Sequence, residues 1–403
     1  MGTSIGSESS LTPSVQPAAI HRVFSDKAWI EGAALHQLEE MARLAGVREI
    51  VAFPDLHPGK YGATGVALLS ERIHPLLIGN DIGCGMSLFA LDLPLRKLKV
   101  DKAAARLRAF EAQEIDDASA RLEEAGLPPE LFQNSLGTIG GGNHFCELQA
   151  IDKVADGEAF DDQRLYLLVH SGSRGFGASV FESTVSSQPS LKDGLDPVSE
   201  AGEVWLAAHD RCVAWASLNR QLVAERAGLA LGAEVELIAD IPHNLVRVSS
   251  GGFIHHKGAA AVRPGELAPV AGSRASLSHL VRAGEGVTGA LGAISHGAGR
   301  KYDRASMYGR VGKTRSDREQ LLRNAWGGVA ICDDRNLVIE EAAAAYKDAG
   351  HVVADLAAAG LVTPVATLRP LVTYKKAVDE VETERRDRKS GHREMRRQKD
   401  GWR

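Results

Sequence analysis

Four short blocks, three of them glycine-rich, constrain the fold of this chain more than any other feature of its sequence. Each places a His, or an Asp with a Cys, in a turn next to an apolar, strand-like run. The blocks are residues 80–85 (NDIGCG), 140–144 (GGGNH), 169–175 (VHSGSRG) and 241–244 (IPHN). Glycine lets the backbone approach a ligand closely, so the blocks indicate a binding site built at strand ends.

The side chains in these blocks are typical metal ligands. Asp81, Cys84, His144, His170 and His243 combine hard and borderline-soft donors, a mixture that suits Mn²⁺, Fe²⁺ or Zn²⁺ better than Ca²⁺ or Mg²⁺. The spacing of Asp81 and Cys84 lets both face one point if the loop curls, and a thiolate can bridge two metals. Any one block is more typical of an ordinary turn or a structural His. All four together predict a metal centre.

A fifth block, residues 295–300 (SHGAGR), has a different character. Its glycines let a phosphate approach the backbone N–H groups, and Arg300 can neutralise the phosphate charge. A neutral imidazole at His296 can attack phosphorus and form a covalent phosphoramidate. Taken alone, the block is also compatible with a fifth metal ligand or a plain anion site.

The apolar patterning predicts a mixed α/β (α+β) fold in a single large domain over residues 21–376, without an interior linker. Residues 1–20 are Ser/Thr/Pro/Gly-rich and are expected to be a flexible lead-in, while 377–403 form a charged tail. Helices are expected at 33–45, 100–125, 200–228 and 336–360. Strands are expected at 48–53, 65–69 and 165–170, as a strand–turn–strand at 234–248, and as short strands within 251–295.

Cysteine usage and hydropathy indicate which cellular compartment the protein is expected to occupy. The four cysteines lack paired spacing, and the N-terminal segment does not read as a secretory signal, so we expect a reducing, cytoplasmic setting. No apolar run is long enough for a membrane helix. The net charge of −5 does not exclude nucleic acid as a partner, because a local basic patch is sufficient.

The blocks, in their order along the chain, resemble those of the RtcB family of tRNA-splicing and RNA-repair ligases. Three further segments carry the resemblance: residues 54–59 (PDLHPG), 255–258 (HHKG) and 369–375 (RPLVTYK). Together the motifs cover about residues 30–376. The resemblance implies an RtcB-like domain with mixed sheets around a central cleft that holds two metal ions.

The resemblance also implies roles for individual residues. Cys84 would be shared by two Mn²⁺ ions, with Asp81, His144, His170 and His243 as the other ligands. His296 would attack GTP and carry GMP, acting with Asp81 and Cys84 as the catalytic group. The positions implied to hold the guanylate are Asn143, Phe145, Glu147, Asn244, Ser278, Gly297, Ala298, Gly299 and Lys375. Those implied to contact RNA or phosphate are Arg174, Lys257, Arg300 and Arg304.

The implied activity joins an RNA 3′-phosphate or 2′,3′-cyclic phosphate end to a 5′-hydroxyl end, through a histidine–GMP and then an RNA-3′-guanylylated intermediate. Some members of the family use an archease-type activator. Two alternatives stay open: a metal-dependent phosphohydrolase on the same scaffold, and a non-catalytic RNA-binding paralogue. The tail is either a solvated segment or an electrostatic arm for RNA phosphates.

The chain departs from the family's usual pattern in three places. Residues 272–276 read GSRAS where GTMGT is common, which makes Ser278 the least securely aligned position. Residues 79–84 read GNDIGC where GYDINC is commoner, and the charged tail extends past Lys375. These departures suggest a divergent branch that repairs damaged RNA rather than splicing tRNA.

Overall fold

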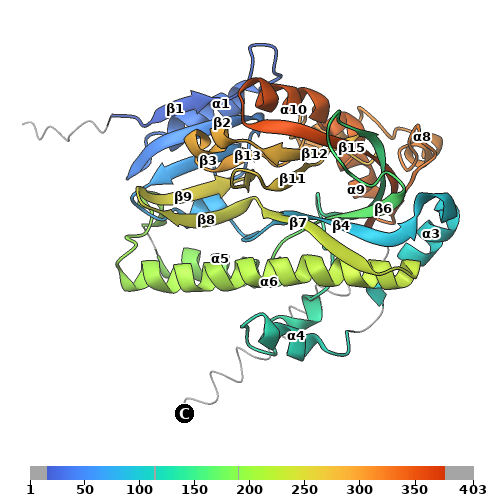
Figure 1. Ribbon diagram of the computed structural model, residues 1–403. Helices are drawn as coiled ribbons and strands as arrows, with labels where there is room; N and C mark the ends of the chain where they lie inside the picture. Colours follow the sequence, from blue (N-terminus) through green and yellow to red (C-terminus); the bar gives the residue numbers. More distant parts are fainter. Residues whose placement is uncertain (1–15, 113–114, 189, 377–403) are drawn as a thin grey trace, which may run out of the picture.

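The computed structural model describes residues 16–112, 115–188 and 190–376 (Figure 1). Most of the expected lead-in (1–20) and all of the expected tail (377–403) therefore lie outside the described residues. The first strand, β1 (Ala19–Arg22), begins inside the range expected for the lead-in.

An eight-stranded sheet forms the centre of the molecule, in the order β11-β12-β15-β5-β6-β4-β7, with β14 paired to β15. All neighbours on this path are antiparallel, and the terminal strands β11 and β7 also contact each other, so the sheet curls towards a barrel. The strands are β4 (Gly85–Pro94), β5 (Phe145–Val154), β6 (Arg164–Ser171), β7 (Val235–Pro242), β11 (Leu267–Val270), β12 (Ser278–Ala283), β14 (Val329–Cys332) and β15 (Val362–Lys376).

The register of this sheet brings the glycine-rich blocks together. Strands β4 and β5 begin where β6 and β7 end, so Gly85 pairs with both Ser171 and Pro242, and Phe145 pairs with His170. In an antiparallel sheet the start of one strand lies beside the end of its neighbour. Four blocks that are far apart in the sequence therefore meet at one edge.

A second sheet lies beside the first, in the order β1-β2-β3-β9-β8. Strands β10 and β13 pair with each other in a separate two-stranded sheet, and β10 directly follows β9 in the chain. Strand β2 carries Asp55 near its end, and β13 ends immediately before His296. The additional strands are β2 (Val47–His57), β3 (Thr64–Ser70), β8 (Asn244–Ser249), β9 (Gly252–Lys257), β10 (Ala259–Ala261) and β13 (Ala293–Ser295).

The longest helix, α6 (Glu200–Leu231), runs along one face of the central sheet, and α10 lies on the opposite side of the molecule (Figure 1). The Ser199 side chain caps the first turn of α6, and this helix ends at Gly232, which has a φ of 76°. The other helices are α1 (Gly32–Met41), α2 (Pro75–Ile78), α3 (Val100–Leu107), α4 (Ala118–Glu124), α5 (Arg174–Ser187), α7 (Arg304–Met307), α8 (Arg315–Gln320), α9 (Arg335–Glu340) and α10 (Ala349–Ala358). Short 3₁₀ turns occur at Leu95–Lys97, Phe110–Ala112, Gln133–Ser135, Leu191–Asp193, Glu285–Ala290 and Ala343–Ala345.

Both faces of the central sheet are buried, which explains why its strands read as apolar runs. Along β4, Phe89 and Leu91 pack with α6 residues such as Val223. The alternate side chains, including Leu88, pack with β12 and β15 on the other face. The expected mixed α/β single domain is confirmed.

The expected continuous helix over 100–125 is wrong. The structure has α3, a 3₁₀ turn at Phe110–Ala112 and the separate helix α4. Phe110 is buried in the same cluster as Leu107, edge-on to Tyr374, whereas Leu122 is buried in a different cluster with Trp215 of α6. The two ends of the expected helix therefore pack in different clusters, and tertiary packing overrides the helical pattern.

Within the described ranges, no helix combines the length and the apolar character that crossing a membrane requires.

Candidate active site

The five predicted metal ligands meet at the edge where β4, β5, β6 and β7 converge. The Cys84 Sγ lies 3.4 Å from His144 Nε2 and 3.2 Å from His170 Nε2. Asp81 Oδ2 lies 2.9 Å from His144 Nε2, and His243 Nε2 lies 3.2 Å from His170 Nε2. The thiol thus stands between an Asp81–His144 pair and a His170–His243 pair, and Cys84, His144 and His170 lie close enough together to hold a metal ion.

The electrostatics of this cluster fit a cation. Burial holds the pKa of His170 and His243 well below the ordinary value, so both imidazoles are neutral and can donate lone pairs. Burial, together with the adjacent Asp81 carboxylate, raises the pKa of the Cys84 thiol well above its usual range. A bound cation reverses that effect and stabilises the thiolate. Neutral imidazole nitrogens 3.2 Å apart, next to a buried thiol, are therefore suited to a metal ion.

The loop geometry around Asp81 depends on one glycine. A Cβ at Gly172 would collide with the Asp81 carboxylate, so only glycine at this position leaves room for Asp81 beside His144. The block at 169–175 therefore contributes the predicted ligand His170 and, at Gly172, the space that Asp81 occupies.

Arg220, from α6, supports the loops that carry the cluster through buried hydrogen bonds. Its guanidinium donates to the carbonyl oxygens of Gly83 (2.9 Å) and Ser171 (3.1 Å), the residues next to Cys84 and His170. It also pairs with Asp240 at 2.7 Å and is 1% exposed. Because it joins two ligand-bearing blocks, this buried arginine is a positioning residue for the cluster.

Replacing Arg220 with Met is expected to lower the free energy of unfolding by about 3–5 kcal/mol, because Asp240, whose side chain is only 20% exposed, would lose its cationic partner and two main-chain carbonyls would lose their donor. Urea denaturation measures this change. The double variant Arg220→Met/Asp240→Leu should recover much of the loss, and exposed Arg335→Met is the matched control. A decrease in the free energy of unfolding below about 1 kcal/mol would contradict the positioning role of Arg220.

His296 lies directly beside this cluster. Its ring centroid is 4.6 Å from that of His243, and its Nδ1 lies 2.7 Å from Oδ2 of the fully buried Asp55, although the ring is not aligned for a straight hydrogen bond. A Cβ at Gly299 would collide with the Asp55 main chain, so this glycine (φ 69°) allows the two loops to touch. A carboxylate at Nδ1 orients the ring and leaves Nε2 as the reactive nitrogen.

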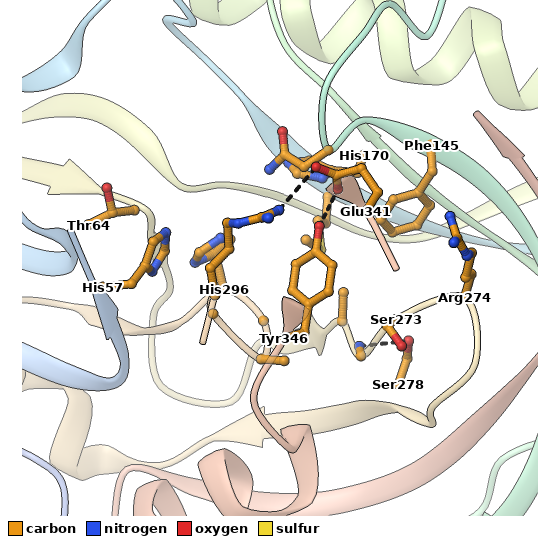
Figure 2. A pocket seen from close by; sticks show the side chains of 18 of the residues that line it. His57, Thr64, Phe145, His170, Ser273, Arg274, Ser278, His296, Glu341 and Tyr346 are labelled. Carbon is orange, nitrogen blue, oxygen red and sulfur yellow. Dashed lines mark hydrogen bonds and ion pairs between the residues drawn. The ribbon is translucent and has the colours of Figure 1, made fainter. Parts of the chain in front are cut away.

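A cavity of about 320 Å³ opens at His296 (Figure 2). Besides His296 and His170, it is lined by these residues predicted from the sequence: Asn143, Phe145, Glu147, Ser278, Gly297, Ala298, Gly299, Arg300, Arg304 and Lys375. Glu147 is buried; burial raises its pKa to about 7, and Thr373 and Gln149 donate hydrogen bonds to its carboxylate. The size and polar lining suit a nucleotide-sized ligand.

Of the residues predicted to hold the guanylate or to contact RNA or phosphate, three lie outside the lining of this cavity. Asn244 donates to the carbonyl oxygens of Ile78 and Asp81, so it supports the metal-type loop. Lys257 donates to the same Ile78 carbonyl. Arg174, with φ 54°, donates to Thr138.

Glu341 organises the cationic side of the cavity. It pairs with Arg300 (3.1 Å), Arg304 (3.2 Å) and Lys375 (3.4 Å), and Tyr346 donates to it. Burial alone would raise the pKa of Glu341, but the cations, led by Lys375, lower it to about 2. Motif reading did not assign a role to Glu341, Arg220 or Asp55. Only Asp55 had a local signal, the 54–59 loop.

Comparison with known proteins places the chain among RNA ligases. A family model described as tRNA-splicing ligase RtcB matches residues 37–119 and 111–376. The chain is 41% identical over 377 residues to RNA-splicing ligase RtcB2 of Escherichia coli (strain ATCC 25922), covering 89% of this chain and 96% of that protein. It is 29% identical to RNA-splicing ligase RtcB of Escherichia coli K12 (86% and 95% covered). It is 27% identical to tRNA-splicing ligase RtcB of Thermococcus kodakarensis (88% and 94% covered).

Proposed function

The chain belongs to the RtcB family of RNA ligases, and we propose that it is a GTP- and Mn²⁺-dependent enzyme that joins RNA 3′-phosphate or 2′,3′-cyclic phosphate ends to 5′-hydroxyl ends. The observation that carries this proposal is the position of His296. It lies between a buried carboxylate, a Cys/His cluster and a nucleotide-sized cavity. A plain anion site would need neither Asp55 nor the cluster.

In the proposed reaction, Nε2 of His296 attacks the α-phosphorus of GTP. A P–N bond forms, the bond to the β-phosphate oxygen breaks, and pyrophosphate leaves. Asp55 favours this step because its carboxylate, 2.7 Å from Nδ1, stabilises the positive charge that develops on the ring. The 297–299 backbone and Arg300 line the cavity next to His296, so their N–H groups can donate to the phosphates.

The second half of the proposed reaction transfers GMP from His296 to the RNA 3′-phosphate. The 5′-hydroxyl of the other RNA end then attacks the activated 3′-phosphorus, so that a 3′,5′ phosphodiester forms and GMP leaves. A 2′,3′-cyclic phosphate must first be opened to the 3′-phosphate.

Asp81, Cys84, His144, His170 and His243 would hold two Mn²⁺ ions, with Cys84 shared. Bound there, the ions would supply Lewis-acid stabilisation of phosphate charge beside His296. Action on damaged RNA in the cytoplasm, with or without an archease-type activator, stays a prediction from the sequence.

The test is covalent labelling of the full chain. Incubated with Mn²⁺ and GTP labelled at the α-phosphate, the denatured protein should carry label, whereas GTP labelled at the γ-phosphate should leave none. Addition of RNA with a 3′-phosphate should chase the label into RNA, and a 5′-hydroxyl strand should complete joining. Nucleotide hydrolysis without labelled protein would indicate the phosphohydrolase instead. RNA binding without either reaction would indicate the non-catalytic paralogue.

A further inference from the structure

Arg274 is a buried arginine that the proposed reaction leaves without a role. It lies in the 272–276 segment, where this chain departs from the pattern common in the family. Only 7% of the residue is exposed, and it lines the cavity that opens at His296. Its Nη2 donates to the Val338 carbonyl at 2.6 Å, but its buried Nη1 has no hydrogen-bond partner.

An unpartnered guanidinium nitrogen in a buried position destabilises a protein unless something binds it. Leaving such a donor unsatisfied costs about 1–3 kcal/mol or more when the group is charged. The carboxylate nearest this part of the cavity, Glu341, is already paired with Arg300, Arg304 and Lys375. Because the guanidinium lines the cavity, it is available to donate to a ligand there.

The position of Arg274 decides which part of a nucleotide it can touch. Figure 2 shows His296 and Arg274 on opposite sides of the pocket, with Tyr346 between them and Phe145 next to Arg274. A nucleotide whose α-phosphate lies at His296 has its base at the far end. The phosphates stay near the 297–299 loop, so Arg274 meets the base.

The chemistry of this far end favours guanine. Arg donors pair with the adjacent O6 and N7 acceptors of guanine, whereas adenine presents an amino donor at the position of O6. Glu147, in the same cavity, offers a carboxylate that can accept hydrogen bonds from the opposite edge of guanine. Phe145 offers an aromatic ring beside the base.

We propose that Arg274 is a specificity-determining residue whose guanidinium donates to the O6/N7 edge of guanine, so that the enzyme selects GTP over ATP. This inference rests on the proposed function, because it places the α-phosphate at His296. It adds a contact at a position where the common family pattern has an uncharged residue.

The first experiment changes the ligand and leaves the protein intact. Self-labelling of the wild-type chain is compared among GTP, 7-deaza-GTP, which lacks the N7 acceptor, and 2-aminopurine riboside triphosphate, which lacks both O6 and the proton on N1. At least one analogue should label with an efficiency lower by about 10- to 100-fold, as expected for a lost hydrogen bond to a charged donor. Inosine triphosphate keeps both acceptors and lacks only the 2-amino group, so its deficit should not depend on Arg274.

The second experiment repeats the comparison with Arg274→Met. GTP labelling should fall by a similar factor, ATP labelling should not fall, and the deficit of the sensitive analogue should disappear. The inosine deficit should persist. Arg274→Lys, which keeps one charged donor, should recover part of the GTP preference if Arg274→Met folds poorly. Arg335→Met, an exposed arginine on α9, is the matched control.

The outcomes separate this inference from the proposed function. If the wild-type chain labels with no nucleotide, the proposed function fails. If it labels with GTP and both analogues equally well, the proposed function stands and the role of Arg274 is overturned. A purely structural Arg274 would lower labelling by every nucleotide alike and would leave the analogue deficit unchanged.

Discussion

The His296→Ala variant should lose covalent labelling by GTP completely, a fall of at least about a thousandfold. The imidazole is the proposed nucleophile, and it lies between the Cys/His cluster and Asp55. Joining of RNA with a 3′-phosphate should disappear with the label. Autoradiography of denatured protein and a gel-based joining assay measure the two losses.

The same variant allows a test of when His296 acts. A nucleophile is needed only to form the first intermediate, so His296→Ala should still join RNA that already carries GMP on its 3′-phosphate. His296→Gln keeps a polar group beside buried Asp55 and guards against misfolding. Exposed His351→Ala serves as control. Persistent labelling in both His296 variants would place the nucleophile elsewhere.

The side chains predicted as metal ligands lie together in the structure, and they could be recognised because they lie in short blocks with strong local signals. Apolar runs border Cys84, His144, His170 and His243, and an antiparallel sheet necessarily brings such strand ends to one edge. Neither the pairing order nor the register is visible in the blocks themselves. The resemblance to a known family supplied what local patterns could not.

Glu341 illustrates what could not be predicted. It lies just past α9 in a run of Glu and Ala that any exposed helix could carry. Its importance arises from Arg300, Arg304 and Lys375, which are 41, 37 and 34 residues away. The break in the expected 100–125 helix has a similar origin, because Phe110 and Leu122 belong to different cores. Both features depend on tertiary contacts without local signals.

Arg274 is the opposite case: the sequence departs from the common family pattern at this position, but the sequence alone did not indicate what the residue does. The GSRAS segment differed from the common pattern, and this difference alone suggested only divergence. The structure places the arginine in the nucleotide-sized cavity with a free donor. A departure from a motif can therefore mark altered ligand contact rather than loss of function.

Replacing Cys84 with Ala is expected to abolish turnover and to weaken Mn²⁺ binding by more than about 100-fold, while RNA binding stays close to normal. Sγ lies 3.4 Å from His144 and 3.2 Å from His170, so its loss removes a ligand from both proposed metal positions at once. RNA is held mainly by phosphate contacts, which do not involve the thiol. Metal titration by calorimetry, with cobalt–thiolate absorption as a second readout, measures the first effect.

Fluorescence anisotropy with labelled RNA measures the binding that should persist in the Cys84 variant. Cys212→Ala is the matched control, because Cys212 is also buried and free but belongs to an apolar cluster with Trp215 and is not one of the predicted ligands. If Cys84→Ala bound two Mn²⁺ ions and ligated at a near-normal rate, the shared-ligand assignment would be wrong. Loss of one ion alone would assign Cys84 to a single metal. Loss of both would support the thiolate as the bridge that couples the Asp81–His144 and His170–His243 pairs.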